Sequence, residues 1–201
     1  PNFNFMKFIL TFIALSMSFY LSSQDQSDLP FAEIPEYPQS YSAGTVSARL
    51  IDGLGFRYYW ATEGLRETDL MHKPSDQARS MEETLDHLYG LSLTIANAPQ
   101  QLVNQRPADC PEMSFEEKRA RTLENFHKAR TLLISADNQD IEASQIIFKR
   151  GENQYDFPFW NLINGPIADA IWHTGQVVLM RRTAGNPINS KVNVFMGKLN
   201  D

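Results

Sequence analysis

Residues 80–97 read SMEETLDHLYGLSLTIAN, and this stretch contains the start signal, the apolar face and the stop signal of one helix. Ser80 and Glu83 form a capping box, in which the serine oxygen accepts from the amide of Glu83 and the glutamate accepts from the amide of Ser80. Asn97 and Pro99 are typical of a helix end. The apolar residues recur with the helical period and predict the buried side: Met81, Leu85, Leu88, Leu91 and Ile95.

Two further helices are predicted before and after this one. The segment 45–62 has an apolar residue at every fourth position, which predicts a buried face made of Val46, Leu50, Leu54 and Tyr58. A second capping box, formed by Ser114 and Glu117, opens a helix that turns four apolar residues inward: Phe115, Leu123, Phe126 and Leu133.

The last helix and the segment before it complete the predicted fold. The run Asn164-Gly165-Pro166 is expected to start this helix, because a proline at the first helical position loses no backbone hydrogen bond. Gly185-Asn186-Pro187 is expected to stop it. Residues 145–156 have two short β-prone pieces around Gly151, which predict a small hairpin or an irregular excursion. Four amphipathic helices with few strands predict an all-α protein, an antiparallel four-helix bundle.

Composition limits the size and the partners of the chain. With 201 residues and 42% hydrophobic residues, the chain is expected to form one domain around one core. Its formal net charge of −6, with Lys and Arg scattered along it, predicts that nucleic acid is not a partner. The single cysteine, Cys110, excludes an internal disulfide and a multi-cysteine zinc site. A metal would therefore need His and carboxylate ligands.

The amino-terminal part is expected to be a secretory signal peptide. Phe8–Leu21 form an uncharged apolar run of 14 residues, shorter than the roughly 20 that span a bilayer. We expect a signal peptide over 1–23, with 1–5 as an extension before the first methionine, a proline-containing linker over 24–40 and the folded domain over 41–201. The protein is thus predicted to be exported, periplasmic or extracellular, with no stable membrane anchor; an uncleaved signal anchor is the alternative.

Asp169 and His173 are the first candidates for chemistry. They lie four residues apart in the last predicted helix, so both face the same side about one turn from each other, which is the spacing of a chelating pair. His87, at the border between the apolar and polar faces of its helix, is the best candidate for a third ligand. In the alternative, Asp169 and His173 form a simple ion pair and His87 bonds a backbone carbonyl. His72 and His127 are expected to be solvated.

The order of these segments resembles the DinB-like superfamily of bacterial metalloproteins, which also includes the YfiT-like proteins and thiol-dependent transferases. The resemblance covers roughly residues 43–187. Its marks are ETLDHL at 83–88, FPFW at 157–160 and DAIWHTGQ at 169–176, with Arg181-Arg182 behind them. In that superfamily one histidine of the second helix and two of the last helix bind a divalent metal. The resemblance implies that the matching metal ligands here are His87, Asp169 and His173.

The second ligand position departs from the family, because it holds an aspartate instead of the usual histidine. Two imidazoles and one carboxylate leave open positions on a metal, so the ion is expected to be zinc, nickel or iron. The first hypothesis is a metal-dependent enzyme that hydrolyses a small molecule with an activated water. The alternatives are a non-catalytic metal-binding or stress-response bundle, a relative of the thiol-dependent transferases, and a bundle without metal. The resemblance also suggests a homodimer; catalytic residues and the substrate stay open.

Overall fold

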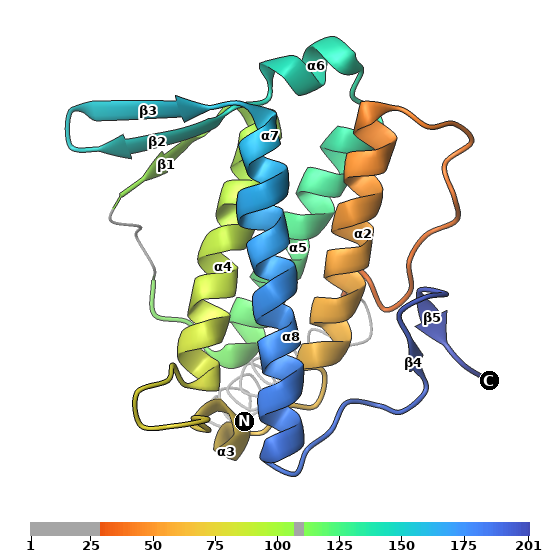
Figure 1. Ribbon diagram of the computed structural model, residues 1–201, viewed down its shortest axis with the longest axis vertical. Helices are drawn as coiled ribbons and strands as arrows, with labels where there is room; N and C mark the ends of the chain where they lie inside the picture. The colour runs from red at the N-terminus through yellow and green to blue at the C-terminus, as the bar shows by residue number, and fades with distance from the viewer. Residues whose placement is uncertain (1–28, 107–110) are drawn as a thin grey trace, which may run out of the picture.

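The computed structural model describes residues 29–106 and 111–201, and this part of the chain is mostly helical with a small sheet. The predicted signal peptide and Cys110 lie outside the described residues. Four long helices run side by side along the molecule (Figure 1): α2 (Ala43–Thr62), α4 (Met81–Asn97), α5 (Phe115–Ile134) and α8 (Ala168–Thr183). Within the described ranges, no helix combines the length and the apolar character that a membrane crossing requires.

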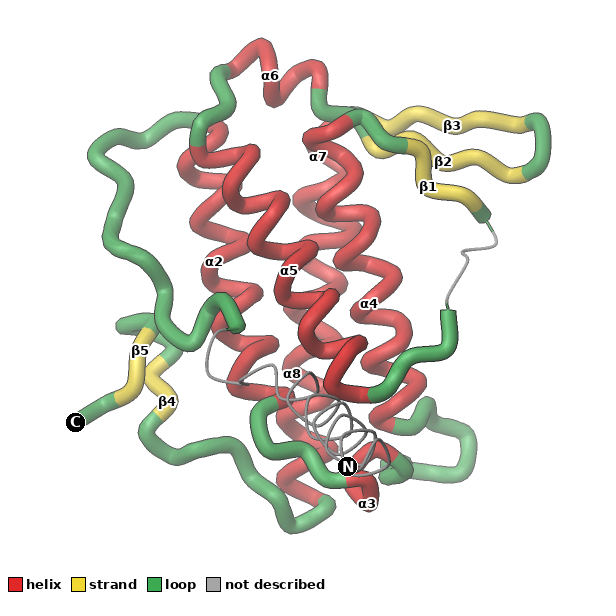
Figure 2. Tube along the Cα trace, turned by 180° about the vertical axis from the view of Figure 1, so that it is seen from behind, coloured by secondary structure: helices red, strands yellow, loops and turns green. Residues whose placement is uncertain are grey.

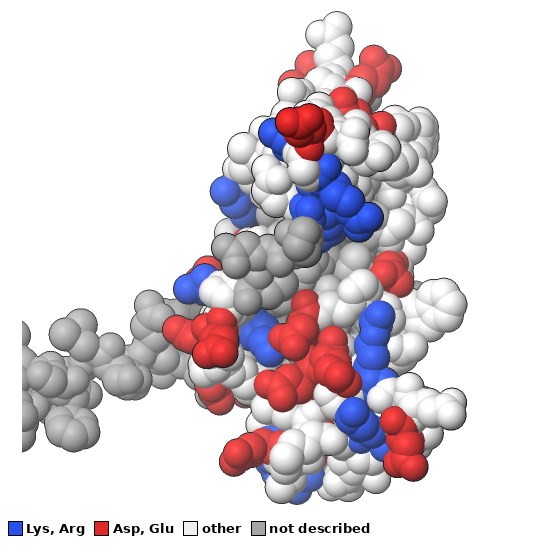
Figure 3. Space-filling view, turned by 90° about the vertical axis from the view of Figure 1, so that its left-hand side faces the viewer, with Lys and Arg blue, Asp and Glu red and all other residues white. Residues whose placement is uncertain are grey.

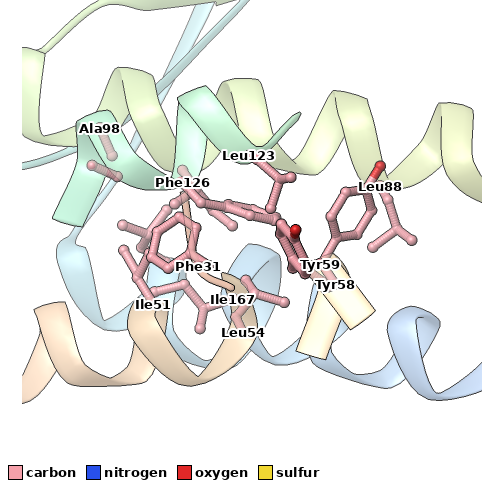
Figure 4. Packing of buried hydrophobic residues seen from close by; sticks show 14 of the residues in the cluster. Phe31, Ile51, Leu54, Tyr58, Tyr59, Leu88, Ala98, Leu123, Phe126 and Ile167 are labelled. Atoms are coloured by element: carbon pink, nitrogen blue, oxygen red, sulfur yellow. The ribbon is translucent and has the colours of Figure 1, made fainter. Parts of the chain in front are cut away.

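Each long helix packs against two of the others. Helix α2 contacts α5 and α8, and α4 contacts the same two helices; Figure 2 shows the arrangement from the side of α5. Because each helix is apolar on one side, this arrangement encloses one continuous core. In Figure 4, Tyr58 of α2 and Phe126 of α5 lie within it, and their rings meet edge to face with centroids 5.8 Å apart.

Both predicted capping boxes are confirmed. The Ser80 amide donates to Glu83 Oε2 at 2.7 Å, and the Glu83 amide donates to Ser80 Oγ at 3.1 Å. Ser114 and Glu117 make the same pair of bonds at 3.1 and 3.2 Å. Helix α4 buries the predicted stripe, with Leu91 partly buried and the others fully buried. These starts depend on local hydrogen bonds, which is why the sequence predicts them well.

Only half of the buried face that the sequence predicted for α2 is buried in the structure. Val46 and Leu50 are exposed, although the second half of the predicted face is buried. Gly44 lies so close to the carbonyl oxygen of Leu133 in α5 that a Cβ atom would not fit. Helix α2 thus turns small residues toward its neighbours, which allows close approach of the helix axes. The buried small residues are Gly44, Ser47, Ala48 and Gly55.

The predicted start of the last helix is also wrong. The helical path begins at α7 (Phe159–Leu162) and passes through a π-helical turn, η3 (Ile163–Ile167), into α8. Pro166 is therefore inside the helix and not at its first position. Since proline has no amide hydrogen and clashes with the preceding turn, the wider π turn accommodates it without ending the helix. Helix α8 ends as predicted, with Gly185 at φ 75° behind it.

The excursion before the last helix is the predicted hairpin. Strands β2 (Ile146–Arg150) and β3 (Asn153–Phe157) pair antiparallel around Gly151, which has φ 59°. Strand β1 (Val103–Gln105) pairs with β2 in parallel, and nothing in the sequence pattern predicted it. A second small sheet joins β4 (Val192–Asn193) and β5 (Lys198–Leu199). The expectation of an all-α protein is thus too narrow. Short helices fill the connections: α3 (Glu67–Leu70), η2 (Ala98–Gln100) and α6 (Asn138–Ala143).

The described end of the predicted linker packs on the helices. Residues 29–40 contain no helix or strand, as expected for the proline-containing segment. However, Phe31 is buried in the core against Gly55, and Trp60 Nε1 of α2 donates to the Ala32 carbonyl at 3.0 Å. The folded body therefore includes residues that precede the predicted boundary at residue 41.

Charged side chains of both signs lie on the face that Figure 3 shows, with an acidic group in the middle and a basic group above it. Between α4 and α5, the buried Lys118 of α5 pairs with the exposed carboxylates of Glu82 and Asp86 of α4. Asp86 is thus directed toward α5, although it is the sequence neighbour of His87. This face is not uniformly basic.

Candidate metal centre

The structure brings His87, Asp169 and His173 together between α4 and α8. His87 Nε2 lies 3.1 Å from Asp169 Oδ2, and His173 Nε2 lies 3.4 Å from Asp169 Oδ1. One ligand atom from each residue lies within 4.8 Å of the others. The two imidazole rings meet edge to face, with centroids 4.6 Å apart. The cluster could hold a metal ion.

The helical period explains why these side chains lie at the edge of the core. Asp169 and His173 each precede a buried residue of α8, Ala170 and Thr174, so they lie one step around the helix toward α4. His87 is likewise followed by the buried Leu88. The side chains of the three residues are 35%, 39% and 17% exposed, in chain order. They are accessible to a ligand and still supported by the packed helices.

Gln176 fixes the ring of His173. Its Oε1 lies 2.7 Å from His173 Nδ1, one helical turn further along α8. When Nδ1 donates to the amide oxygen, the neutral ring keeps the Nε2 lone pair free for a metal ion. A hydrogen bond of this kind orients most histidine ligands of metals. The sequence analysis included Gln176 in the stretch 169–176 but predicted no role for it. Its spacing of three residues from His173 was the feature that could have indicated this contact.

The distances fit the donor set of a metal centre. Imidazole nitrogens and carboxylate oxygens bind zinc at about 2.0–2.2 Å, which places neighbouring ligand atoms of one tetrahedral ion roughly 3.3 Å apart. The separations of 3.1 Å between His87 Nε2 and Asp169 Oδ2 and of 3.4 Å between His173 Nε2 and Asp169 Oδ1 are close to this value, although they involve different oxygens of the carboxylate. Three protein ligands leave at least one coordination position for water or substrate, as catalytic sites do and closed structural sites do not.

A pocket of about 620 Å³ opens beside the three residues. Its size falls within the range of small-molecule sites. Besides the three candidate ligands and Gln176, its walls come from two places. Helices α4 and α8 contribute Thr84, Leu179 and Met180, and the loop between α3 and α4 contributes Pro74, Ala78 and Arg79.

His72 anchors this loop, although the sequence predicted it to be merely solvated. Its Nε2 lies 2.9 Å from Thr183 Oγ1 at the end of α8, and its carbonyl accepts from the Met81 amide at 3.0 Å. The loop is therefore closed at its base and joined to both helices of the site. His127 agrees with its prediction: it is exposed on α5.

Asp69 of α3 fixes the chain just before the loop. Its carboxylate accepts from Arg66 Nε and Nη2 at 2.9 and 2.6 Å, and from Asn186 Nδ2 at 2.6 Å. Asn186 follows α8, so the contact ties α3 to the end of the helix that carries two candidate ligands. The Arg66 guanidinium holds the pKa of Asp69 well below its usual range; Asn186 adds to this effect and burial opposes it.

Arg181 and Arg182, which follow the candidate ligands in the sequence, lie outside the candidate metal centre. Arg181 is buried and donates through Nη1 to the carbonyls of Ala61 and Glu63 at 3.0 and 2.9 Å, where α2 ends. Burial lowers its pKa. Arg182 is exposed and does not line the pocket. Asn164, which lies in the π turn, is likewise exposed and outside the pocket.

Comparison with known proteins adds no relative. No family model, no curated protein and no solved structure matches the chain.

Proposed function

We propose that this chain is a metal-dependent enzyme of the DinB-like type, a four-helix bundle in which His87, Asp169 and His173 hold one divalent cation for hydrolysis of a small molecule. The observation that supports it is the convergence of two imidazoles and one carboxylate from two helices at the mouth of a pocket. The pairwise packing of α2, α4, α5 and α8 supports the bundle, to which the small sheet is an addition.

A divalent cation at this place would lower the pKa of a bound water and polarise a substrate oxygen. The residues of the chain hold and orient the donors. Each oxygen of Asp169 contacts one of the two imidazoles, so the carboxylate holds the two rings in position relative to each other. Gln176 holds the tautomer of His173 in which Nε2 is free to bind. The partly exposed carboxylate leaves access from the pocket.

The choice of metal follows from the donors. A set of two histidines and one aspartate with open positions suits zinc, and it is also the facial triad of non-haem iron(II) enzymes. Nickel is a further candidate because imidazole suits it as well. Thiolate-preferring ions are disfavoured, since none of the three residues offers sulfur.

Export belongs to the same proposal. The uncharged run Phe8–Leu21 supports a cleaved signal peptide, and the mass of the protein recovered from expressing cells tests it. A product that begins near residue 24 is expected, whereas a full-length product in the membrane fraction would favour the signal anchor.

The function is tested by metal content and turnover on the same preparation. The protein is loaded with zinc, nickel or iron(II), freed of excess metal, and measured by mass spectrometry and with panels of carboxylic esters, amides and phosphoesters. We expect one equivalent of metal and hydrolysis that a chelator abolishes. His127→Ala is the matched control, because it removes a histidine far from the site and should keep both properties.

The alternatives give different outcomes. Bound metal with no turnover on any panel would favour the non-catalytic bundle. Absence of metal after incubation with all three ions would contradict the metal centre and leave Asp169 and His173 as an ion pair. Turnover only with a low-molecular-weight thiol present would favour the transferase relative.

A further inference from the structure

The pocket beside the candidate metal centre has one cationic side chain among its described lining residues, Arg79. Another part of the lining is apolar and includes Pro74, Leu179 and Met180. A wall of this kind holds the hydrocarbon part of a ligand, and a few polar groups fix its orientation. The pocket therefore has three different surfaces: a nitrogen and oxygen donor cluster, an apolar wall and a guanidinium group.

Arg79 is exposed and makes no hydrogen bond or ion pair within the described ranges 29–106 and 111–201. Lys73 of the same loop differs in this respect, because its Nζ lies 3.8 Å from Glu83 Oε2. A guanidinium is always charged and presents parallel donors that match a carboxylate. A charged fork at a small-molecule pocket, without a partner among the described residues, is suited to bind a ligand.

The backbone holds Arg79 in place. It directly precedes Ser80, the N-cap of α4, whose capping bonds fix the chain at this point. On its other side, the Ala78 amide donates to the Ser75 carbonyl at 3.1 Å. Together with the contact between His72 and Thr183, these bonds fix the loop on both sides of Arg79. The backbone at Arg79 is thus held in place, and no residue of the described ranges occupies the donors of its side chain.

Charge favours the same ligand class. With two neutral imidazoles and one carboxylate, a divalent cation leaves one net positive charge on the cluster. Arg79 adds a second positive charge, and Asp169 is the only acidic residue in the described lining. An uncharged substrate would leave both positive charges unbalanced, whereas an anionic substrate would neutralise the charge of Arg79 and still place its reacting group at the metal.

We propose that the pocket selects a small organic carboxylate, with its acid group on Arg79, its hydrocarbon part against Leu179 and Met180, and its reacting carbonyl at His87, Asp169 and His173. This inference rests on the proposed metal centre. Arg79 is a specificity-determining residue in it. It takes no part in holding the metal, because a guanidinium is positively charged and has no lone pair to offer a cation.

The test uses hydroxamates, whose paired oxygens bind metals, on the zinc-loaded full chain. Monohydroxamates of succinate, glutarate and adipate are compared with the uncharged alkyl hydroxamates of equal chain length by titration calorimetry. We expect at least one carboxylate to bind about tenfold more tightly than its uncharged counterpart, the value of a charge-assisted hydrogen bond. Arg79→Gln should remove this preference and leave the metal content at one equivalent.

Lys73→Gln is the matched control, because it removes the same charge from the same loop outside the pocket lining. This variant should still bind the carboxylate hydroxamate more tightly than its uncharged counterpart. An equal loss of that preference in both variants would mean that only the overall positive charge of the loop matters, and it would overturn the role of Arg79. Equal binding of charged and uncharged hydroxamates by metal-loaded protein would overturn the carboxylate proposal alone. A parent protein that retains no metal would overturn both this proposal and the metal centre.

Discussion

His87 and Asp169 are 82 positions apart in the sequence, yet His87 Nε2 lies 3.1 Å from Asp169 Oδ2. The contact joins α4 to α8, and His173 reaches the same carboxylate from one turn further along α8. Neither helix by itself provides more than two of the three donors. The candidate centre is therefore a product of helix packing, and its ligands can be tested separately from the stability of each helix.

Replacement of either residue should remove the metal and keep the fold. His87→Ala and Asp169→Ala each leave two donors, too few to retain an ion during dialysis. Both side chains are more than a third exposed, so we expect a change of less than about 1 kcal/mol in the unfolding free energy of the metal-free protein. Metal analysis and far-UV circular dichroism check the two expectations. Stoichiometric metal in either variant would refute the ligand assignment.

Gln176→Ala should weaken metal binding without abolishing it. The variant loses the acceptor that holds the proton on His173 Nδ1, so the ring is free to rotate and to change tautomer. Loss of such a supporting bond costs about tenfold to a hundredfold in metal affinity. Competition with a chromophoric chelator measures it. Gln176→Glu retains an acceptor and should bind at least as tightly as the parent; equal weakening in both variants would speak against this role.

Protonation of Asp69 should make the protein less stable in acid. Its pKa is lowered in the folded protein, so its contribution is fully present above the unfolded pKa of about 3.9 and is lost as the pH falls through the folded pKa. Asp69→Asn should lower the unfolding free energy by about 1–2 kcal/mol at pH 7, with a difference from the parent that shrinks toward pH 2. Urea unfolding at several pH values measures this difference. A difference independent of pH would contradict the charged contact with Arg66.

Phe31→Ala should destabilise the folded body. The ring is buried against Gly55 of α2, and its removal leaves a cavity between helices, which costs about 3 kcal/mol. Tyr41→Ala is the matched control, because Tyr41 is 98% exposed in the same segment and its loss should change stability by less than about 0.5 kcal/mol. Chemical denaturation compares the two. Equal stability of both variants would show that the segment before α2 does not belong to the core.

The sequence predicted those features that depend on neighbours in the chain. The capping boxes at Ser80 and Ser114 are formed by residues three positions apart, so α4 and α5 begin where expected. The hairpin around Gly151 is equally local. The helical spacing of Asp169 and His173 also follows from the chain alone, since one turn of helix puts them on the same side.

Tertiary structure alone decided the rest. Pro166 was expected to start a helix, but packing on both sides favours a continuous helix through a π turn. The parallel pairing of β1 with β2 joins distant segments, and the close approach at Gly44 depends on α5, so neither follows from local pattern. The same holds for the meeting of His87 with Asp169 and for the place of Arg79 at the pocket. Short-range hydrogen bonds select helix starts and turns, whereas side-chain packing over long sequence distances selects which faces meet.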